Sequence, residues 1–166
     1  MNMMVIGNLV SLAGCLLMVA VGFIRKKSHI LAAQCVQFGF MGFGNLLLGG
    51  TSGFISNMVG IARNLVFAKF RTTTALKIFF ILLQLLLSLS SLGDGLISGL
   101  PIIAAAIFTW SLDTKSEAKL KVVIITTQVL WLIYDLYYRN YVATTFDVLT
   151  MGSNIIGFFM VRKSRQ

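Results

Sequence analysis

The stretch from Thr126 to Lys163 reads TTQVLWLIYDLYYRNYVATTFDVLTMGSNIIGFFMVRK and determines how the whole chain is interpreted. An apolar segment leads through a turn with few charges into a second apolar segment with a basic end. Shifted back by 94 positions, without a gap, the stretch lies on residues 32–69, so that Gln128 pairs with Gln34. Because an internal repeat fixes architecture, we predict that this helical hairpin occurs twice.

The composition of the 166 residues predicts an integral membrane protein. Hydrophobic residues make up 57% of the chain and charged residues only 11%, and the mean hydropathy is +0.89. One small globule cannot bury that much apolar surface. The lipid bilayer is therefore the first expected partner.

Seven apolar runs divide the chain, and each is close to the roughly 20 residues that cross a bilayer core as a helix. The fold class that follows is an all-α membrane protein with helices at about 3–24, 30–48, 54–70, 76–92, 96–112, 121–138 and 143–161. The first run has no basic segment before it and continues to Ile24, which argues against a cleavable signal peptide.

The net charge of +9 comes from short basic clusters between the apolar runs, not from a basic face. Nucleic acid is therefore excluded as a partner. At every connection the basic residues fall on one side of the predicted membrane, with Arg139 alone on the other. The positive-inside rule then predicts an odd number of spans, with the N-terminus outside and the C-terminus in the cytoplasm.

Three domains follow from seven spans and one repeat. Residues 1–72 form a first three-helix bundle, residues 73–93 a linker transmembrane helix, and residues 94–166 a second three-helix bundle. The single linker gives both bundles the same orientation, so they are predicted to be parallel repeats about an axis near the membrane normal.

Several segments of the second half carry family resemblances. The segments GLPII (99–103), TWSL (109–112) and MGSNII (151–156) resemble the bacterial inner-membrane YgjV-type family, whose function is poorly defined. More distantly, VLWLIYD (129–135) and the following helix with Asn154 are similar to the SWEET, SemiSWEET and PQ-loop transporters. These resemblances imply a multi-pass protein of the bacterial inner membrane with a SWEET-like arrangement of helices.

The sugar-transporter resemblance also implies site residues. In those transporters an Asn in the third helix of each bundle, and a Trp near it, line the substrate cavity; Asn154 is the counterpart here. The first half departs from this pattern, because position 60 is Gly and the available amide is Asn57, one turn earlier. The pairing of SNMVG (56–60) with SNIIG (153–157) requires an offset of 97. Pro101 is the single proline, whereas the transporters use several as hinges.

Four amides in the apolar runs require an explanation from physical chemistry alone. An unpaired amide facing lipid costs several kcal/mol, so Asn57, Asn154, Gln34 and Gln128 should face the protein interior. Either they form hydrogen bonds between helices, or they bind a neutral polar ligand. Trp131 offers a flat face on which a sugar or a base could stack.

Arg63 and Asp135 are the most deeply placed charges in the predicted helices. Arg63 either extends toward the cytoplasm or neutralises an anionic ligand. Asp135 either lies near the outer interface beside Arg139 or accepts protons in coupled transport. Their different depths exclude a direct ion pair. Asp147 is interpreted as a favourable charge at a helix N-terminus, not as a site residue.

Catalytic motifs are absent from the sequence. The single histidine, His29, lies in a basic loop, no HExxH or phosphate-binding glycine loop occurs, and Cys15 and Cys35 lack metal-ligand spacing. We predict no enzymatic activity, no cofactor and no metal.

Together these observations predict a transporter of a small polar solute, either sugar-like or nucleoside- or vitamin-like. Its cavity would lie between the two bundles and be lined by Asn57, Asn154, Trp131, Arg63, Gln34, Gln128 and Asp135. The alternative is a non-transporting inner-membrane scaffold or assembly protein that keeps the fold. The sequence leaves open whether the chain forms a homo-oligomer.

Overall fold

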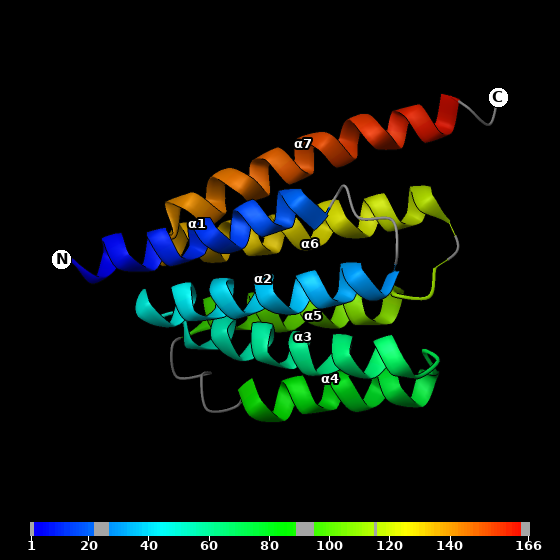
Figure 1. Ribbon diagram of the computed structural model, residues 1–166, viewed down its shortest axis with the longest axis horizontal. Helices are drawn as coiled ribbons and strands as arrows, with labels where there is room; N and C mark the ends of the chain where they lie inside the picture. The colour runs from blue at the N-terminus through cyan, green and yellow to red at the C-terminus, as the bar shows by residue number, and fades with distance from the viewer. Residues whose placement is uncertain (1, 22–26, 89–94, 115, 164–166) are drawn as a thin grey trace.

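A computed structural model describes residues 2–21, 27–88, 95–114 and 116–163. Throughout this part of the chain the regular structure is helical, which confirms the all-α prediction and the number of helices (Figure 1). The elements are α1 (Met3–Val21), α2 (Lys27–Leu47), α3 (Thr51–Lys69), α4 (Thr74–Ser88), the 3-10 turn η2 (Leu96–Ser98), α5 (Gly99–Ser111), α6 (Glu117–Tyr137) and α7 (Tyr141–Lys163).

The helix ends differ from the predicted ones by a few residues. Helix α3 begins at Thr51, three residues before its predicted start, because the polar residues Thr51 and Ser52 form its first turn instead of a loop. The predicted helix ends at Ile24 and Leu92 lie outside the described residues, as do the Gly93–Asp94 turn and the basic residues 25, 26, 115 and 165.

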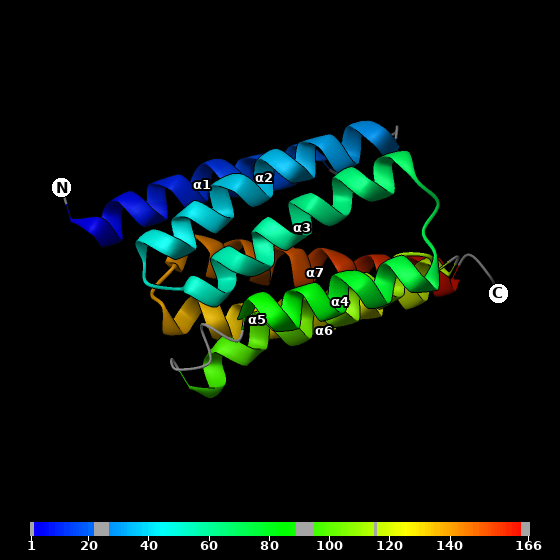
Figure 2. The same ribbon diagram turned by 90° about the horizontal axis from the view of Figure 1, so that it is seen from below.

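The helices pack in two layers that close into a ring. Helix α2 packs between α1 and α3, and α6 packs between α5 and α7. Contacts of α3 with α5 and of α7 with α1 join the two sets, while α4 packs outside the ring on α3 and α5. Figure 2 shows α1–α3 as one layer and α4–α7 as the other, with the layers diverging toward the end where α2 begins.

The α2–α3 and α6–α7 connections are built in the same way. After α2, Gly49 adopts a φ of +88°, and the amide of Gly50 donates to the Asn45 carbonyl at 2.7 Å. After α6, Arg139 adopts a φ of 58°, and the amide of Asn140 donates to the Asp135 carbonyl at 2.8 Å. A left-handed residue followed by this long-reach bond is the Schellman ending, which turns the chain directly into the next helix.

These matched ends correct the register of the repeat. Helix α6 ends 90 positions after α2, since 137 − 47 is 90, and α7 begins 90 positions after α3, since 141 − 51 is 90. The 94-residue and 97-residue registers read from the sequence are therefore wrong for these helices. They differ from the structural register by four and seven residues, which are about one and two helical turns, so each preserves the faces of the helices.

Polar side chains fill much of the interior, whereas apolar side chains cover the outside. Within the described residues, Asn45, Asn64, Gln84 and Asn140 are all at most 2% exposed. By contrast, the outer helix α4 exposes Phe79, Leu82 and Leu86. Helices Ala118–Tyr137 and Tyr141–Met160 are long and apolar enough to cross a membrane. This distribution suits a protein whose surface meets lipid and whose interior satisfies its own polar groups.

Glycines allow the close approach of α1, α2 and α3. A Cβ added at Gly44 would lie 2.1 Å from Ser11 Oγ on α1, and one at Gly42 would lie 3.1 Å from the Asn57 Cβ on α3. At Gly39 of the same helix an added Cβ would meet no atom within 4 Å. Small residues at such crossings are typical of helices packed in lipid.

A salt bridge joins Lys77 of α4 to Asp113, directly after α5. The hydrogen bond from Lys77 lowers the pKa of the Asp113 carboxyl below its ordinary value. A lowered folded-state pKa stabilises the protein above the unfolded pKa, and this contribution is lost as the pH falls through the folded one.

We therefore expect Asp113→Asn to lower the melting temperature slightly at neutral pH and by less as the pH falls below about 4. Thermal unfolding of both proteins across this range measures the effect. A difference between them that is the same at every pH would contradict the salt bridge.

Candidate functional site

A cavity of about 660 Å³ lies between the two helical layers. Its volume is in the range of small-molecule sites. Six helices contribute, among them the ring members α2, α3, α6 and α7, and its polar lining residues are Gln34, Gln37, Ser56, Asn57, Arg63, Thr127, Gln128, Trp131, Asp135, Asp147, Thr150, Ser153 and Asn154.

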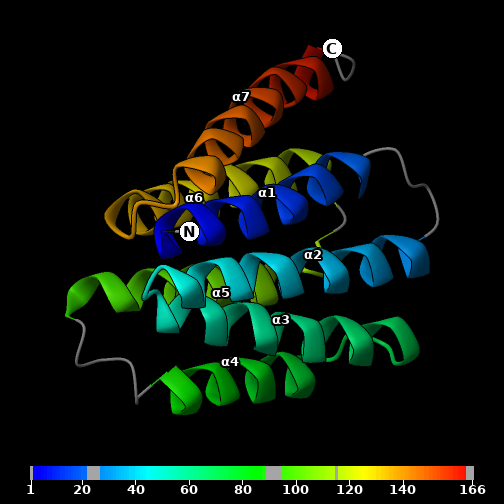
Figure 3. The same cartoon turned by 60° about the vertical axis from the view of Figure 1, so that its left-hand side comes forward.

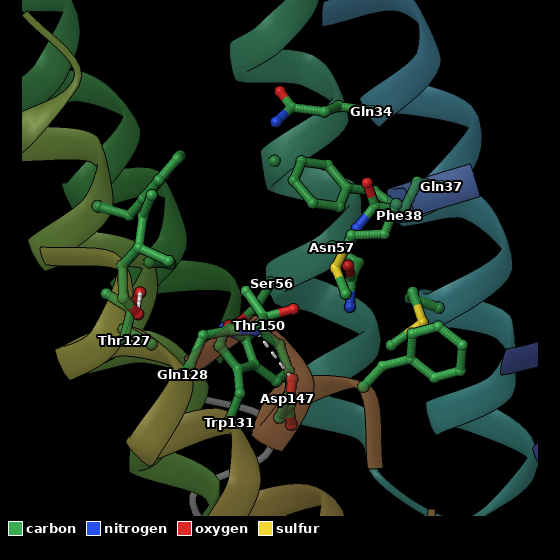
Figure 4. Close-up of a pocket in the computed structure, with 18 of the residues that line it drawn as sticks. Gln34, Gln37, Phe38, Ser56, Asn57, Thr127, Gln128, Trp131, Asp147 and Thr150 are labelled. Atoms are coloured by element: carbon green, nitrogen blue, oxygen red, sulfur yellow. Dashed lines mark hydrogen bonds between the residues drawn. The ribbon is translucent and has the colours of Figure 1, made fainter. Parts of the chain in front are cut away.

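The structure brings all seven predicted site residues to the wall of this one cavity. Figure 4 shows Gln34 and Asn57 on one side, and Gln128 and Trp131 on the other. Arg63, Asp135 and Asn154 complete the set. That these residues bind a solute stays a prediction.

The lining follows the 90-residue repeat. Positions 34, 37, 38 and 41 of α2 line the cavity, and so do positions 124, 127, 128 and 131 of α6. Positions 56, 57, 60 and 63 of α3 line it together with 146, 147, 150 and 153 of α7. The cavity is therefore formed by the same faces of two equivalent hairpins.

The 90-residue register changes which residue of the other hairpin is equivalent to each Asn. Asn57 corresponds to Asp147, and Asn154 corresponds to Asn64. Asn57 and Asn154 nevertheless make the same local bond: each donates its Nδ2 to the carbonyl one turn earlier, Gly53 or Thr150, at 2.8 Å. In the described part of the chain neither Oδ1 has a hydrogen-bond partner, so both amides keep an acceptor for the cavity.

The two glutamines make hydrogen bonds between helices. Gln128 Nε2 of α6 donates to Asp147 Oδ1 of α7 at 3.1 Å. On the other side of the cavity, Gln34 Oε1 of α2 accepts from Asn64 Nδ2 of α3, also at 3.1 Å. The interhelical interpretation is therefore correct for both, and each also lines the cavity.

Asp147 is a site residue that the sequence interpretation missed. It lies in the second turn of α7, is 6% exposed, and lines the cavity next to Asp135, which is 1% exposed. The two carboxyl groups are close enough to interact with each other. Two neighbouring buried carboxylates repel each other, and a proton shared between them would relieve that repulsion.

Asp135 packs inside the bundle, next to Asp147, and not on its exposed surface. One oxygen of each group, Asp135 Oδ1 and Asp147 Oδ2, is buried without a further partner in the described structure. The 90-residue register would have indicated this pair, because it places Asp135 and Asp147 at the positions of Asn45 and Asn57.

Arg63 does not extend to the membrane surface. Its side chain is 4% exposed and its Nη1 donates to Thr109 Oγ1 of α5 at 3.0 Å. Its Nε and Nη2 donate to Asn64 Oδ1 at 3.3 and 3.2 Å, and the guanidinium carbon lies 5.2 Å from the centre of the Phe108 ring. Neutral groups of α3 and α5 therefore hold the Arg63 guanidinium inside the protein.

Trp131 and Trp110 occupy different environments. Trp131 lines the cavity and packs edge-on against Tyr134, with ring centroids 5.7 Å apart. Trp110 is 54% exposed, and Lys77 Nζ lies 5.6 Å from the centre of its ring. An exposed Trp such as Trp110 is of the kind enriched at membrane–water interfaces.

Hydrogen bonds join the two layers at the end where α3 and α7 begin. Tyr134 Oη of α6 accepts from the Gly53 amide of α3 at 2.7 Å, and Asn140 Nδ2 donates to Asn45 Oδ1 at 2.8 Å. Asn8 of α1 donates to the Arg139 carbonyl at 3.1 Å. These bonds hold the layers together at one end of the cavity.

The C-terminal half of α7 is the least enclosed wall. Figure 3 shows α7 leaning away from α1 and α6 toward its C-terminal end. From Val148 to Met160 no described residue of α7 is buried, although Thr150, Ser153 and Asn154 line the cavity. One side of the site is thus formed by a helix with few neighbours.

Within the described ranges, no group of three or more His, Cys, Asp or Glu side chains could hold a metal ion. The polar lining instead offers neutral amides, hydroxyls, one guanidinium and one carboxyl pair. Such groups bind and orient a solute, or exchange a proton with it.

Over residues 5–165 the sequence matches the model of the Imp-YgjV family, described as bacterial inner membrane protein. The chain belongs to this family. Membership agrees with the apolar exterior and the buried polar interior, and it confirms the resemblance to YgjV-type proteins. No curated protein and no solved structure gives a significant match. The resemblance to SWEET and PQ-loop transporters accordingly stays a prediction.

Proposed function

We propose that this inner-membrane protein carries a small polar solute through the cavity between its two helical layers. In this proposal all seven helices span the membrane, with α1–α3 and α5–α7 as parallel bundles and α4 as the linker. The basic connections place the N-terminus outside and the C-terminus in the cytoplasm.

The cavity is the observation that carries the proposal. A buried polar lining is unfavourable in a membrane protein unless it is filled or functional. Here Asn57 and Asn154 keep unpartnered acceptors, and Trp131 presents apolar surface beside them. A scaffold or assembly protein with the same fold would gain nothing from this lining, so the cavity favours transport over that alternative.

The position of the cavity between the layers also fits alternating access. In the proposed orientation the hydrogen-bonded end, with Tyr134 and Asn140, faces outside. The layers diverge toward the opposite, cytoplasmic end (Figure 2). The structure would then represent a state closed to the outside, and transport would require the Tyr134 and Asn140 contacts to break.

We predict that a solute raises the melting temperature of the purified protein and that Asn154→Ala abolishes this shift. Ligand that binds only the folded state stabilises it by mass action, by about 2.7 kcal/mol at a hundredfold excess over Kd. The screen covers sugars, nucleosides, vitamins and small carboxylates.

The matched control for this screen is Thr145→Ala. Thr145 is exposed on the same helix and makes the same type of bond, from Oγ1 to the Tyr141 carbonyl at 2.8 Å, but does not line the cavity. It should keep the shift. Absence of a shift with every compound, together with capture of a stable membrane partner in a pull-down, would favour the scaffold alternative.

A further inference from the structure

Arg63 is a buried cation that the described structure leaves without a counter-charge. The acceptors of its three hydrogen bonds are the Thr109 hydroxyl and the Asn64 amide, which are both neutral. From α2 the Cys35 thiol interacts with it, and from α5 the Phe108 ring lies against it. The salt bridge found within the described residues joins Lys77 to Asp113 and does not involve Arg63.

The carboxyl pair of the second hairpin does not neutralise Arg63. In the 90-residue register Arg63 corresponds to Ser153, which lies six residues beyond Asp147 along α7. Six residues are about 9 Å of helix, before the width of the cavity is added. A separation of that size exceeds the length of a hydrogen bond, so the carboxyl pair is not a direct partner of the guanidinium.

Arg63 also keeps donors for a ligand. A guanidinium carries five N–H donors, and three hydrogen bonds are formed here. The side chain lines the cavity beside Asn57 and Gly60. An added Cβ at Gly60 would lie 3.1 Å from the Phe38 ring and 3.9 Å from Arg63 Nη2, so a larger residue there would crowd the lining beside the guanidinium.

We propose that Arg63 binds the carboxylate of a small organic acid, which makes the transported solute an anion. This inference rests on the proposed function and names the substrate class for the same cavity. A carboxylate matches the planar fork of the guanidinium and brings one negative charge to one positive charge. A doubly charged phosphate would leave an excess charge in the cavity. Asn57, Ser153 and the other neutral groups would then bind the uncharged part of the acid.

The test uses pairs of compounds in which a carboxylate is replaced by an uncharged amide: lactate with lactamide, nicotinate with nicotinamide, and glucuronate with glucuronamide. Each is added to the purified full-length protein, and the melting temperature is measured for the wild type, Arg63→Gln, Arg63→Lys and Arg71→Gln. Arg71 is exposed between α3 and α4 and is the matched control for loss of one positive charge.

We expect at least one acid, and none of its neutral partners, to stabilise the wild type and Arg71→Gln. Arg63→Gln should weaken binding of that acid at least tenfold, and Arg63→Lys should weaken it less, because it keeps the charge but loses the fork. The melting temperatures without compound show that each variant is folded.

Two results would overturn the proposal. Equal stabilisation by an acid and its neutral partner, unchanged in Arg63→Gln, would refute the anion site and leave the solute cavity intact. Absence of stabilisation by all three acids would also refute the anion site. Binding of a neutral compound in the wider screen would then still support transport, so the two proposals fail separately.

Discussion

Tyr134→Ala should destabilise the protein by about 3 to 5 kcal/mol, the usual cost of removing a large buried aromatic side chain. Tyr134 is fully buried, with 0% exposure, and its ring packs against Trp131 and Tyr138. Its hydroxyl also accepts from the Gly53 amide in the first turn of α3. Tyr134→Phe should cost about 1 to 3 kcal/mol, because the buried amide then loses its partner. Denaturant unfolding in detergent measures both values.

The control for this prediction lies on the same helix. Tyr137 is 59% exposed, so Tyr137→Ala should have little effect. A second check uses the close contact with Gly53, where an added Cβ would lie 2.6 Å from Tyr134 Cε1. Gly53→Ala should therefore be costly in the wild type and less so in Tyr134→Ala, where the contact with Asn45 Nδ2 at 2.8 Å remains. Additive effects of these two substitutions, or equal effects at Tyr134 and Tyr137, would show that this junction does not hold the layers together.

The sequence was sufficient to predict the helices, because apolar runs of membrane length leave few alternatives. It also identified residues that share the cavity, since an amide or a charge inside such a run is pushed toward the interior. Gln34, Gln128 and Arg63 are examples, since all three line the cavity. What each side chain contacts there depends on the register between helices, which composition does not specify.

The error in the repeat shows this limit. A shift by four residues keeps the apolar and polar faces aligned, so the 94-residue alignment paired Gln128 with Gln34 and appeared consistent. Only the ends of the helices distinguish the 94-residue register from the 90-residue register, and these ends are fixed by the turns at Gly49 and Arg139. The two turns have no sequence motif in common, because the left-handed residue is a glycine in one and an arginine in the other. The wrong register concealed the equivalence of Asn57 and Asp147.

The equivalence of Asn57 and Asp147 leads to a prediction about a proton shared between Asp135 and Asp147. The two hairpins have Asn45 and Asn57 at the positions where the second hairpin has Asp135 and Asp147, so the fold accepts an amide at both. Asp147→Asn should therefore fold. It replaces the carboxyl–carboxyl contact with an amide that can donate to the Asp135 carboxylate, and the shared proton is no longer required. The ionisable neighbours, Cys15 of α1 and Tyr134 of α6, bring no positive charge to replace it.

The chain contains four aspartates, Asp94, Asp113, Asp135 and Asp147, so carbon-13 labelling of their carboxyl groups gives a spectrum that can be assigned by substitution. At neutral pH we expect one proton to be held by the pair in the wild type and to be lost in Asp147→Asn and in Asp135→Asn. Asp113→Asn, which changes a carboxylate outside the cavity, should leave the proton in place.

Two ionised carboxylates in the wild type at neutral pH would contradict a shared proton. If raising the sodium concentration converted the protonated signal to carboxylate, the pair would instead bind a cation. A proton that is present only in the paired state could be released when a solute separates the two carboxyl groups, which would couple solute binding to proton movement.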